Sequence, residues 1–125
     1  MPLKIEVHEK SGNTATIELS GRLDGEGATE LDVVLAPLLT QKPHAIVLDM
    51  ADLDYISSDG IGVLLGARKR LEQAGGKLLL IHLRPHIEKV FRVIQAIPDG
   101  GVFRNRAELD SYLQSIQRRA KGQPE

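Results

Sequence analysis

The chain has 125 residues, of which 42% are hydrophobic and 26% are charged, and its formal net charge is -1. This length suits one domain with one core, and the small net charge gives no electrostatic reason to expect binding to nucleic acid or to an anionic membrane. The chain has two Tyr, two Phe and no Trp, so it lacks the stacking platforms that single-strand binders use.

Residue types and segments that are missing from the chain narrow the possible classes of protein further. The chain has no Cys, which excludes disulfides, thiolate zinc sites and cysteine nucleophiles and fits a reducing compartment. No stretch approaches the roughly 18 apolar residues of a membrane span, and the N-terminal residues Met1 to Lys4 lack the apolar core of a signal peptide. We therefore expect a small cytoplasmic protein without direct membrane insertion.

The first part of the chain predicts two antiparallel strands. Residues 3–9 alternate apolar with polar side chains, which is the period-two pattern of a half-buried strand. Residues 11–13 are typical of a turn, and residues 14–19 resume as a second strand. Strands joined by so short a turn pair in the antiparallel direction.

The next segment predicts a helix and a buried strand. Asp24 precedes a run with helical apolar spacing from Ala28 to Leu38, so we expect it to cap that helix. Residues 45–48 form a continuous apolar run, as expected of a strand that is covered on both faces. We expect this strand to end at Asp49.

A parallel strand–helix–strand unit follows. Residues 58–74 have the apolar spacing of an amphipathic helix, and two glycines at 75–76 end it. Residues 77–83 form a further apolar strand. A strand, a helix and a strand in this order imply a right-handed crossover and parallel pairing.

The last part of the chain predicts two more helices. Pro85 opens a helix with apolar positions from Ile87 to Ile94, and residues 102–103 can form a short edge strand. Asn105 and Glu108 are spaced as a capping box for a final helix. The sequence therefore predicts an α/β fold with a mixed sheet, in which an N-terminal antiparallel pair precedes parallel strands, and about four helices. We assign residues 1–117 to this single domain and residues 118–125 to a polar tail.

The segment from Tyr55 to Gly62 places two hydroxyls and a carboxylate where a loop turns into a helix. Ser57, Ser58 and Asp59 are all candidates for the N-cap of that helix. Alternatively, one serine is a phosphate acceptor, because a helix N-terminus favours added negative charge by about 0.3–1 kcal/mol. The local spacing leaves both interpretations open.

Glycines in the first turns of the same helix indicate a close approach to its backbone. Gly60, Gly62 and Gly66 lie there, and each costs roughly 1 kcal/mol relative to Ala in a helix interior. The approaching group is either the underlying sheet or a partner protein. Ile56 and Ile61 face the same alternatives, and we expect both to lie on an interface.

The order of several short motifs resembles the STAS domain family, and within it the stand-alone bacterial anti-sigma factor antagonists. The resemblance covers roughly residues 3 to 115, and its pieces are residues 21–24, 46–53, 55–58, 60–66, 75–80 and the helix that ends in Val90 and Phe91.

The resemblance implies a binding switch without enzymatic activity or a cofactor. In this family the unphosphorylated form binds an anti-sigma factor, often also a serine kinase, and thereby releases the sigma factor. The kinase then phosphorylates a serine at a helix N-terminus, and a metal-dependent serine phosphatase reverses the modification. By the resemblance the acceptor is Ser58, with Ser57 as the alternative. The docking surface that we expect around it consists of Asp24, Tyr55, Ile56, Ser57, Asp59, Ile61 and Gly62.

Asp59 departs from the family pattern. The family commonly has Asp-Ser-Ser-Gly or Ser-Ser-Ala-Gly here, whereas this chain has Ser-Ser-Asp-Gly at 57–60. The carboxylate beside the acceptor either impairs kinase docking or weakly mimics a phosphate, although it has less charge and fewer acceptor oxygens than phosphoserine.

Other classes fit the sequence less well. A receiver domain needs an acidic pair after its first strand, and a dinucleotide loop follows its strand directly; neither pattern occurs here. The carboxylates of Asp49, Asp52 and Asp54 are read as solvated side chains, with no metal site. The rival interpretation lies within the family: an unphosphorylated scaffold subunit of a stress-signalling or lipid-transport complex, which uses the same helix as a permanent docking face.

Overall fold

The fold was taken from a computed structural model that describes residues 1–96 and 106–122. Four strands form one sheet in the order β1-β2-β3-β4, with bounds Lys4–Ser11, Thr14–Leu23, Ala45–Ile56 and Lys77–Ile81. β1 pairs with β2 in the antiparallel direction, whereas β2 with β3 and β3 with β4 are parallel. The mixed sheet predicted from the sequence is confirmed.

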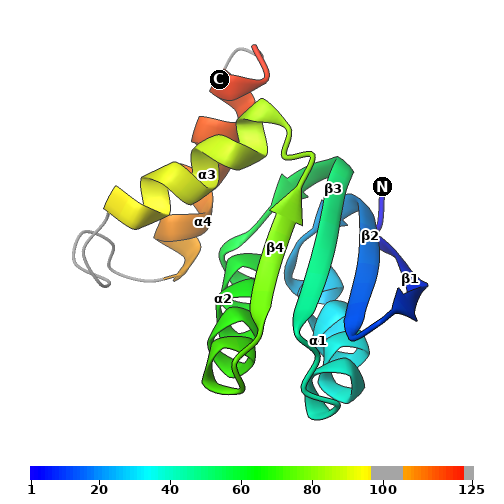
Figure 1. The fold of residues 1–125 in the computed structure, drawn as a ribbon. Coiled ribbons are helices and arrows are strands. Elements are labelled where there is room, and N and C mark those ends of the chain that lie inside the picture. Colours follow the sequence, from blue (N-terminus) through cyan, green and yellow to red (C-terminus); the bar gives the residue numbers. More distant parts are fainter. Residues whose placement is uncertain (97–105, 123–125) are drawn as a thin grey trace.

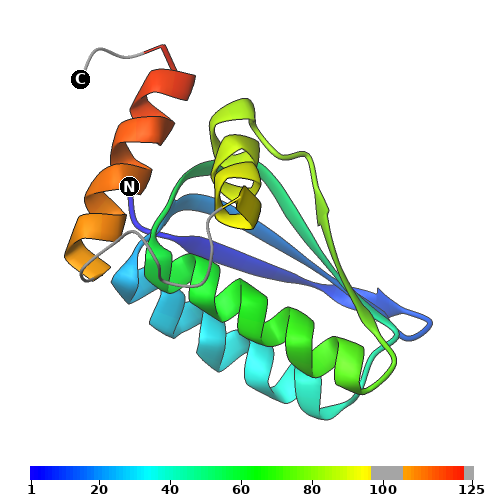
Figure 2. The same cartoon turned by 90° about the vertical axis from the view of Figure 1, so that its left-hand side faces the viewer.

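Four helices complete the described fold: α1 Gly25–Thr40, α2 Ser58–Gln73, α3 Pro85–Ala96 and α4 Arg106–Ala120. α1 and α2 cover one face of the sheet, as Figure 2 shows. α3 and α4 pack against each other beyond the carboxyl ends of β3 and β4 (Figure 1). The two helix pairs therefore meet near the end of β3, where α2 begins. None of the described helices is long and apolar enough to cross a membrane.

The core lies between the sheet and the helices α1 and α2. Its largest fully buried side chains come from alternate positions of β2 and β3 and from the inner stripes of the two helices. They include Ile17, Leu19, Ile46, Leu48, Leu31, Leu35, Leu64 and Leu71. Burial of a large aliphatic side chain contributes about 1.5–3 kcal/mol, so this stripe pattern is the main source of stability.

β3 is longer than predicted, and the expectation that it ends at Asp49 is wrong. The strand continues to Ile56 because its pairing with β2 shifts register twice, between Glu18 and Ser20 and between Gly21 and Arg22. Such bulges change which residues face the core. The buried positions Met50, Leu53 and Ile56 are consequently three residues apart, a spacing that a period-two reading does not recognise.

The other element boundaries follow from local backbone geometry. β4 ends at Ile81, before the predicted end at residue 83, because His82 has a positive φ of 59°. Gly75 has a φ of +83°, the left-handed conformation that commonly ends a helix, and α2 ends just before it. α4 extends to Ala120, into the segment assigned to the polar tail, and the domain limits of 1–117 and 118–125 stay a prediction. The predicted strand at 102–103 and the cap at Asn105 lie outside the described residues.

Candidate functional site

The candidate site lies where β3 ends and α2 begins. Ser57 is extended, with φ -97° and ψ 173°, and its Oγ accepts a hydrogen bond of 3.2 Å from the Gly60 N–H. Of the three candidates for the N-cap, the structure therefore selects Ser57. Its side chain is buried, and its hydroxyl oxygen is already engaged as the hydrogen-bond acceptor of one free amide of the first turn.

Ser58 is the first residue of α2 and has a different environment. The residue as a whole is 8% exposed, and its Oγ is buried with no hydrogen-bond partner among the described residues. Its backbone N–H donates to Oδ1 of Asp110 at 2.8 Å. Because buried hydroxyls normally have a partner, the unpaired Oγ of Ser58 is the exceptional polar atom of the described structure.

The helix α4 lies over this site and holds the end of β3. The Gln117 side chain accepts from the Ile56 N–H at 3.0 Å and donates from Nε2 to the Ile56 carbonyl at 2.8 Å. Gln117 is 2% exposed. One amide side chain thus satisfies both backbone groups of the residue that precedes the cap, as a neighbouring strand would.

The rim of the site carries several charged groups. Asp24 caps α1, as predicted, by accepting from the Gly27 N–H at 2.9 Å. Asp59 lies close to the start of α1, because a Cβ built on Gly25 would be 3.1 Å from its Oδ2. The starts of α1 and α2 are therefore adjacent and each carries a carboxylate, as suits the positive end of a helix dipole.

Tyr55 forms the aromatic part of the rim. The guanidinium of Arg22 lies 4.1 Å from the centroid of the Tyr55 ring, in a cation–π contact. Burial raises the pKa of the Tyr55 hydroxyl, and the nearby Asp110 carboxylate raises it further. Tyr55 thus stays neutral and half-buried at the end of β3.

Two predicted interface residues lie in the core instead. Ile56 is 0% exposed and Ile61 is 4% exposed. The expectation that their side chains form a docking surface is wrong for this conformation, because the bulged end of β3 and the first turn of α2 turn both inward. They support the site from below.

The glycines of α2 divide into two groups. A Cβ on Gly60 would lie 2.6 Å from Cγ of Leu23, so Gly60 is required for packing against β2. A Cβ on Gly62 or Gly66 would meet nothing within 4 Å. The close approach predicted for these glycines is made by the sheet at Gly60, whereas Gly62 and Gly66 open onto the surface between α1 and α2.

Sequence reasoning missed the α4 residues and His86. His86 is 3% exposed, and its Nε2 donates to the Asp54 carbonyl at 2.7 Å; burial lowers the pKa of its imidazole. The Asp54 carboxylate accepts from Lys121 Nζ at 2.6 Å, which lowers the pKa of that carboxyl. Gln117 follows the apolar positions Leu113 and Ile116 at helical spacing, a pattern that indicates burial. No sequence signal marks Asp110.

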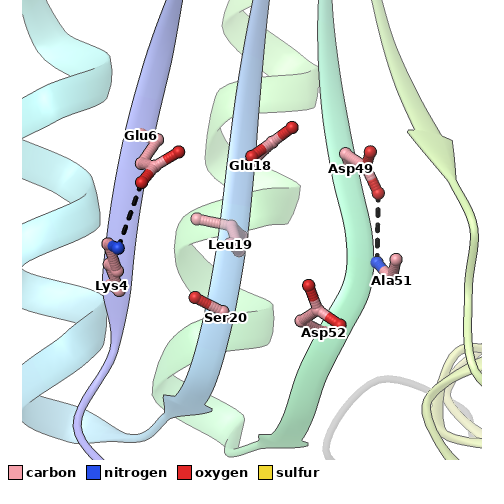
Figure 3. A pocket seen from close by; sticks show the side chains of 8 residues that line it. All are labelled: Lys4, Glu6, Glu18, Leu19, Ser20, Asp49, Ala51 and Asp52. Carbon is pink, nitrogen blue, oxygen red and sulfur yellow. Dashed lines mark hydrogen bonds and ion pairs between the residues drawn. The ribbon is translucent and has the colours of Figure 1, made fainter.

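A second polar surface lies on the open face of the sheet (Figure 3). Glu6, Glu18 and Asp49 are register partners across three adjacent strands. Glu6 pairs with Lys4 at 3.1 Å, and Asp49 accepts from the Ala51 N–H at 3.1 Å. In the part of the chain that the structure describes, one group of three possible metal ligands occurs here, namely Glu6, His8 and Glu18, and all three are exposed. Exposed acidic groups of this kind are common without a bound ion, so the candidate site stays at the start of α2.

Comparison with known proteins places this geometry in a family. The sequence model described as Mlab, STAS domain matches residues 7–96, which is more than half of the chain. The chain belongs to the STAS domain family. The matched part contains the whole sheet from residue 7 onward, α1, α2 and α3, together with the two serines at the start of α2.

Two curated relatives of this STAS protein are named by their role. BtrV of Bordetella bronchiseptica, provisionally named an anti-sigma factor antagonist, is 39% identical over 75 residues, which are 60% of this chain and 65% of that protein. The match thus spans slightly less than two thirds of BtrV. The anti-sigma-B factor antagonist of Listeria monocytogenes is 26% identical over 93 residues, which are 74% of this chain and 82% of the relative.

Solved structures confirm the STAS fold. The unphosphorylated form of the anti-sigma factor antagonist SpoIIAA has a TM-score of 0.64 at 24% identity, covering 71% of this chain and 82% of that one. The phosphorylated form of the Bacillus protein SpoIIAA has the same TM-score and identity, with coverage of 73% and 83%. The likeness to both forms is equal.

Proposed function

We propose that this STAS protein is an anti-sigma factor antagonist that acts by binding and performs no catalysis. In its unphosphorylated form it binds an anti-sigma factor that is also a serine kinase, in the cytoplasm. Phosphorylation of Ser58 ends the complex, and a serine phosphatase restores it. The observation that carries the proposal is the unpaired Ser58 hydroxyl in the first turn of α2, in a chain whose named relatives are anti-sigma factor antagonists.

The geometry favours Ser58 over Ser57 as the acceptor. The Ser57 Oγ caps α2 through the Gly60 N–H, so a phosphate ester on it would disturb a bond that is worth about 1 kcal/mol to the helix. The Ser58 Oγ makes no such bond. Its modification therefore removes no existing interaction of that oxygen.

Electrostatics explains how the modification would end the complex. A phosphate adds about -1.5 to -2 charges at neutral pH. Asp24 and Asp59 lie at the adjacent starts of α1 and α2, so the surface around Ser58 is already acidic. An unpaired charge buried in an interface costs several kcal/mol, and about 1.4 kcal/mol is a tenfold loss of affinity. One modification is thus sufficient to release a partner.

The proposed docking surface is smaller than the set predicted from the sequence. With Ile56 and Ile61 in the core, the side chains left to touch a partner are those of Asp24, Tyr55 and Asp59, together with the exposed backbone at Gly62. Ser57 contributes by fixing the first turn.

Phosphopeptide mapping of the protein isolated from its own organism, during growth and under stress, tests this function. We expect variable phosphorylation at Ser58. In pull-downs with the native protein as bait, Ser58→Ala should retain a kinase-type anti-sigma factor and Ser58→Asp should lose it, while the control Ser111→Asp on α4 should retain it. Absence of phosphate under every condition, together with equal binding by both Ser58 variants, would contradict the switch.

A non-phosphorylated scaffold is the second candidate function. The burial of the Ser58 Oγ favours it, because a kinase needs access to that oxygen. In a scaffold subunit of a stress-signalling or lipid-transport complex, Ser58→Ala and Ser58→Asp should affect partner binding alike. The same pull-down therefore separates the two functions.

A further inference from the structure

One face of α4, together with Lys121 directly after its last residue, makes polar contacts with the end of β3 and the start of α2. Asp110 accepts from the Ser58 N–H at 2.8 Å, Gln117 bonds both backbone groups of Ile56, and Lys121 pairs with Asp54 at 2.6 Å. The helical spacing of positions 110, 117 and 121 puts them on the same side of the helix. Leu113, also on this side, is fully buried.

The Asp110 contact joins α4 to the residue that carries the buried hydroxyl. A residue in the first turn of a helix ordinarily has access to solvent on the side of its free amides. Here the Ser58 Oγ is buried although it bonds to nothing in the described structure. In-line phosphoryl transfer requires the acceptor oxygen to approach the donor phosphate, so a kinase can reach the Ser58 Oγ only after the structure around it opens. α4 is the element that bonds directly to this residue, through Asp110.

The Asp110 carboxylate also occupies the position that an anion would take. The free N–H groups at a helix N-terminus bind phosphates and carboxylates, and the Ser58 N–H already donates to Asp110. A phosphate on Ser58 would compete for the amides of the same turn, and its charge would repel the carboxylate. The docked position of α4 and the phosphorylated state of Ser58 therefore disfavour each other.

α4 is also separate from the part of the chain that defines the family. The family match ends at residue 96, whereas α4 begins at Arg106. Most of the core cluster is formed by residues of the matched part, to which α4 adds Leu113 and Ile116. Displacement of α4 would therefore expose these two side chains, whereas the buried residues of β2, β3, α1 and α2 would still pack against one another.

We propose that α4 is a removable cover of Ser58, held by Asp110 and Gln117, that slows phosphorylation when docked and is displaced once Ser58 carries a phosphate. This inference rests on the proposed function for its biological meaning, since it regulates the same serine. By linkage, the factor by which docking disfavours the phosphorylated state at equilibrium equals the factor by which the phosphate disfavours docking; the rate of phosphorylation is a separate quantity.

Thiol labelling can measure, without a kinase, how often position 58 becomes accessible to a reagent. Because the chain has no Cys, Ser58→Cys places a single thiol at the site, and its rate of reaction with an aromatic disulfide reagent reports how often position 58 is uncovered. Adding Asp110→Ala or Gln117→Leu should raise this rate at least about tenfold, which corresponds to about 1.4 kcal/mol.

Matched variants control for general loosening of the fold. Asp32→Ala on α1 and Gln114→Leu on α4 change the same residue types at exposed positions, and both should leave the labelling rate within about twofold of Ser58→Cys alone. Urea unfolding of each variant checks that the domain is intact. Amide hydrogen exchange in the chain with native Ser58 gives a second readout, in which Asp110→Ala should speed exchange of the Ser58 N–H and Gln117→Leu that of the Ile56 N–H.

The outcomes for the cover and for the phosphorylation switch are distinguishable. Labelling rates and amide exchange that stay unchanged in Asp110→Ala and Gln117→Leu would overturn the cover, even if phosphate is found on Ser58. Accelerated labelling in a protein that is never phosphorylated would support the cover and refute the switch. If the cover regulates phosphorylation, Asp110→Ala should also raise the phosphorylated fraction of Ser58 in cells, and an unchanged fraction would refute that role.

Discussion

Two glycines in successive turns of α2 should respond to the same substitution with opposite signs. A Cβ at position 60 would lie 2.6 Å from Leu23 Cγ and 3.0 Å from the Leu23 carbonyl oxygen, and Leu23 is 0% exposed. A Cβ at position 62 would meet nothing within 4 Å. Gly60→Ala should therefore destabilise the domain and Gly62→Ala should stabilise it.

The expected magnitudes follow from these contacts. Alanine in a helix interior is worth up to about 1 kcal/mol over glycine, and Gly62→Ala gains this without a clash. Overpacking of a filled core costs about 1–3 kcal/mol, which at position 60 exceeds the helix gain because a backbone oxygen is one of the obstructing atoms. Because the helix gain is common to both variants, they should differ in free energy of unfolding by the overpacking cost alone, which is more than about 1 and up to about 3 kcal/mol.

Urea unfolding monitored by far-UV circular dichroism is the suitable assay, since the chain has no Trp. Equal slopes against urea would show that the comparison reflects stability and not a change in the unfolded state. Gly66→Ala is the matched control, because a Cβ there also meets nothing within 4 Å, and it should behave like Gly62→Ala. A Gly60→Ala protein as stable as the native chain would refute the packing argument.

The same variants test the docking surface. If a partner approaches the α2 backbone at Gly62, the methyl group of Gly62→Ala should weaken partner binding while it stabilises the free domain. Stability and binding then change in opposite directions, which simple unfolding cannot produce. Unchanged binding would remove Gly62 from the docking surface.

The remaining predictions concern a cap, a buried imidazole and the core. Asp24→Ala should cost about 1 kcal/mol in urea unfolding through loss of the α1 cap, whereas Asp24→Asn should cost little; equal losses would contradict a capping role. Burial lowers the pKa of His86, so near pH 6.5 and just below it the unfolded chain binds a proton at this imidazole more readily than the folded chain. The contribution of His86 to the free energy of unfolding should therefore be fully present above about pH 6.5 and should be lost as the pH drops below that value. His86→Gln should flatten this decline, and an unchanged slope would assign it to other groups. Leu31→Ala, at a 0% exposed position, should cost about 2–5 kcal/mol, whereas Val33→Ala, at 69% exposure, should stay within about 0.5 kcal/mol.

Much of the fold was predictable because it is encoded in local patterns. Alternation in β1 and β2, the apolar run at the start of β3 and the helical spacing of α1 and α2 each identify an element without reference to the others. The Asp24 cap was predictable for the same reason, since its partner Gly27 is three residues away. Where β3 passes Asp49 the pattern fails, because its register is set by pairing with β2 and not by its own sequence.

The position of the candidate site was predictable from the sequence, but the burial and the contacts of its side chains were not. The serines and the helix start are consecutive in sequence, so the position of the site was clear. The hydrogen-bond partner of the Ser58 N–H is Asp110, which is 52 positions away. Likewise, the inward orientation of Ile56 depends on the bulges and on Gln117, which is 61 positions away. No periodicity within a short window encodes such pairs.

The order of the elements along the chain has a consequence for synthesis of the protein. β3 and α2 leave the ribosome before α4. Gln117 follows Ile56 by 61 positions, which at about 5–20 residues per second is a delay of about 3–12 s. During that interval the nascent domain has its sheet and the start of α2 but lacks the hydrogen bonds from Gln117 and Asp110. A newly made molecule therefore passes through the uncovered form once, before any signal acts on it.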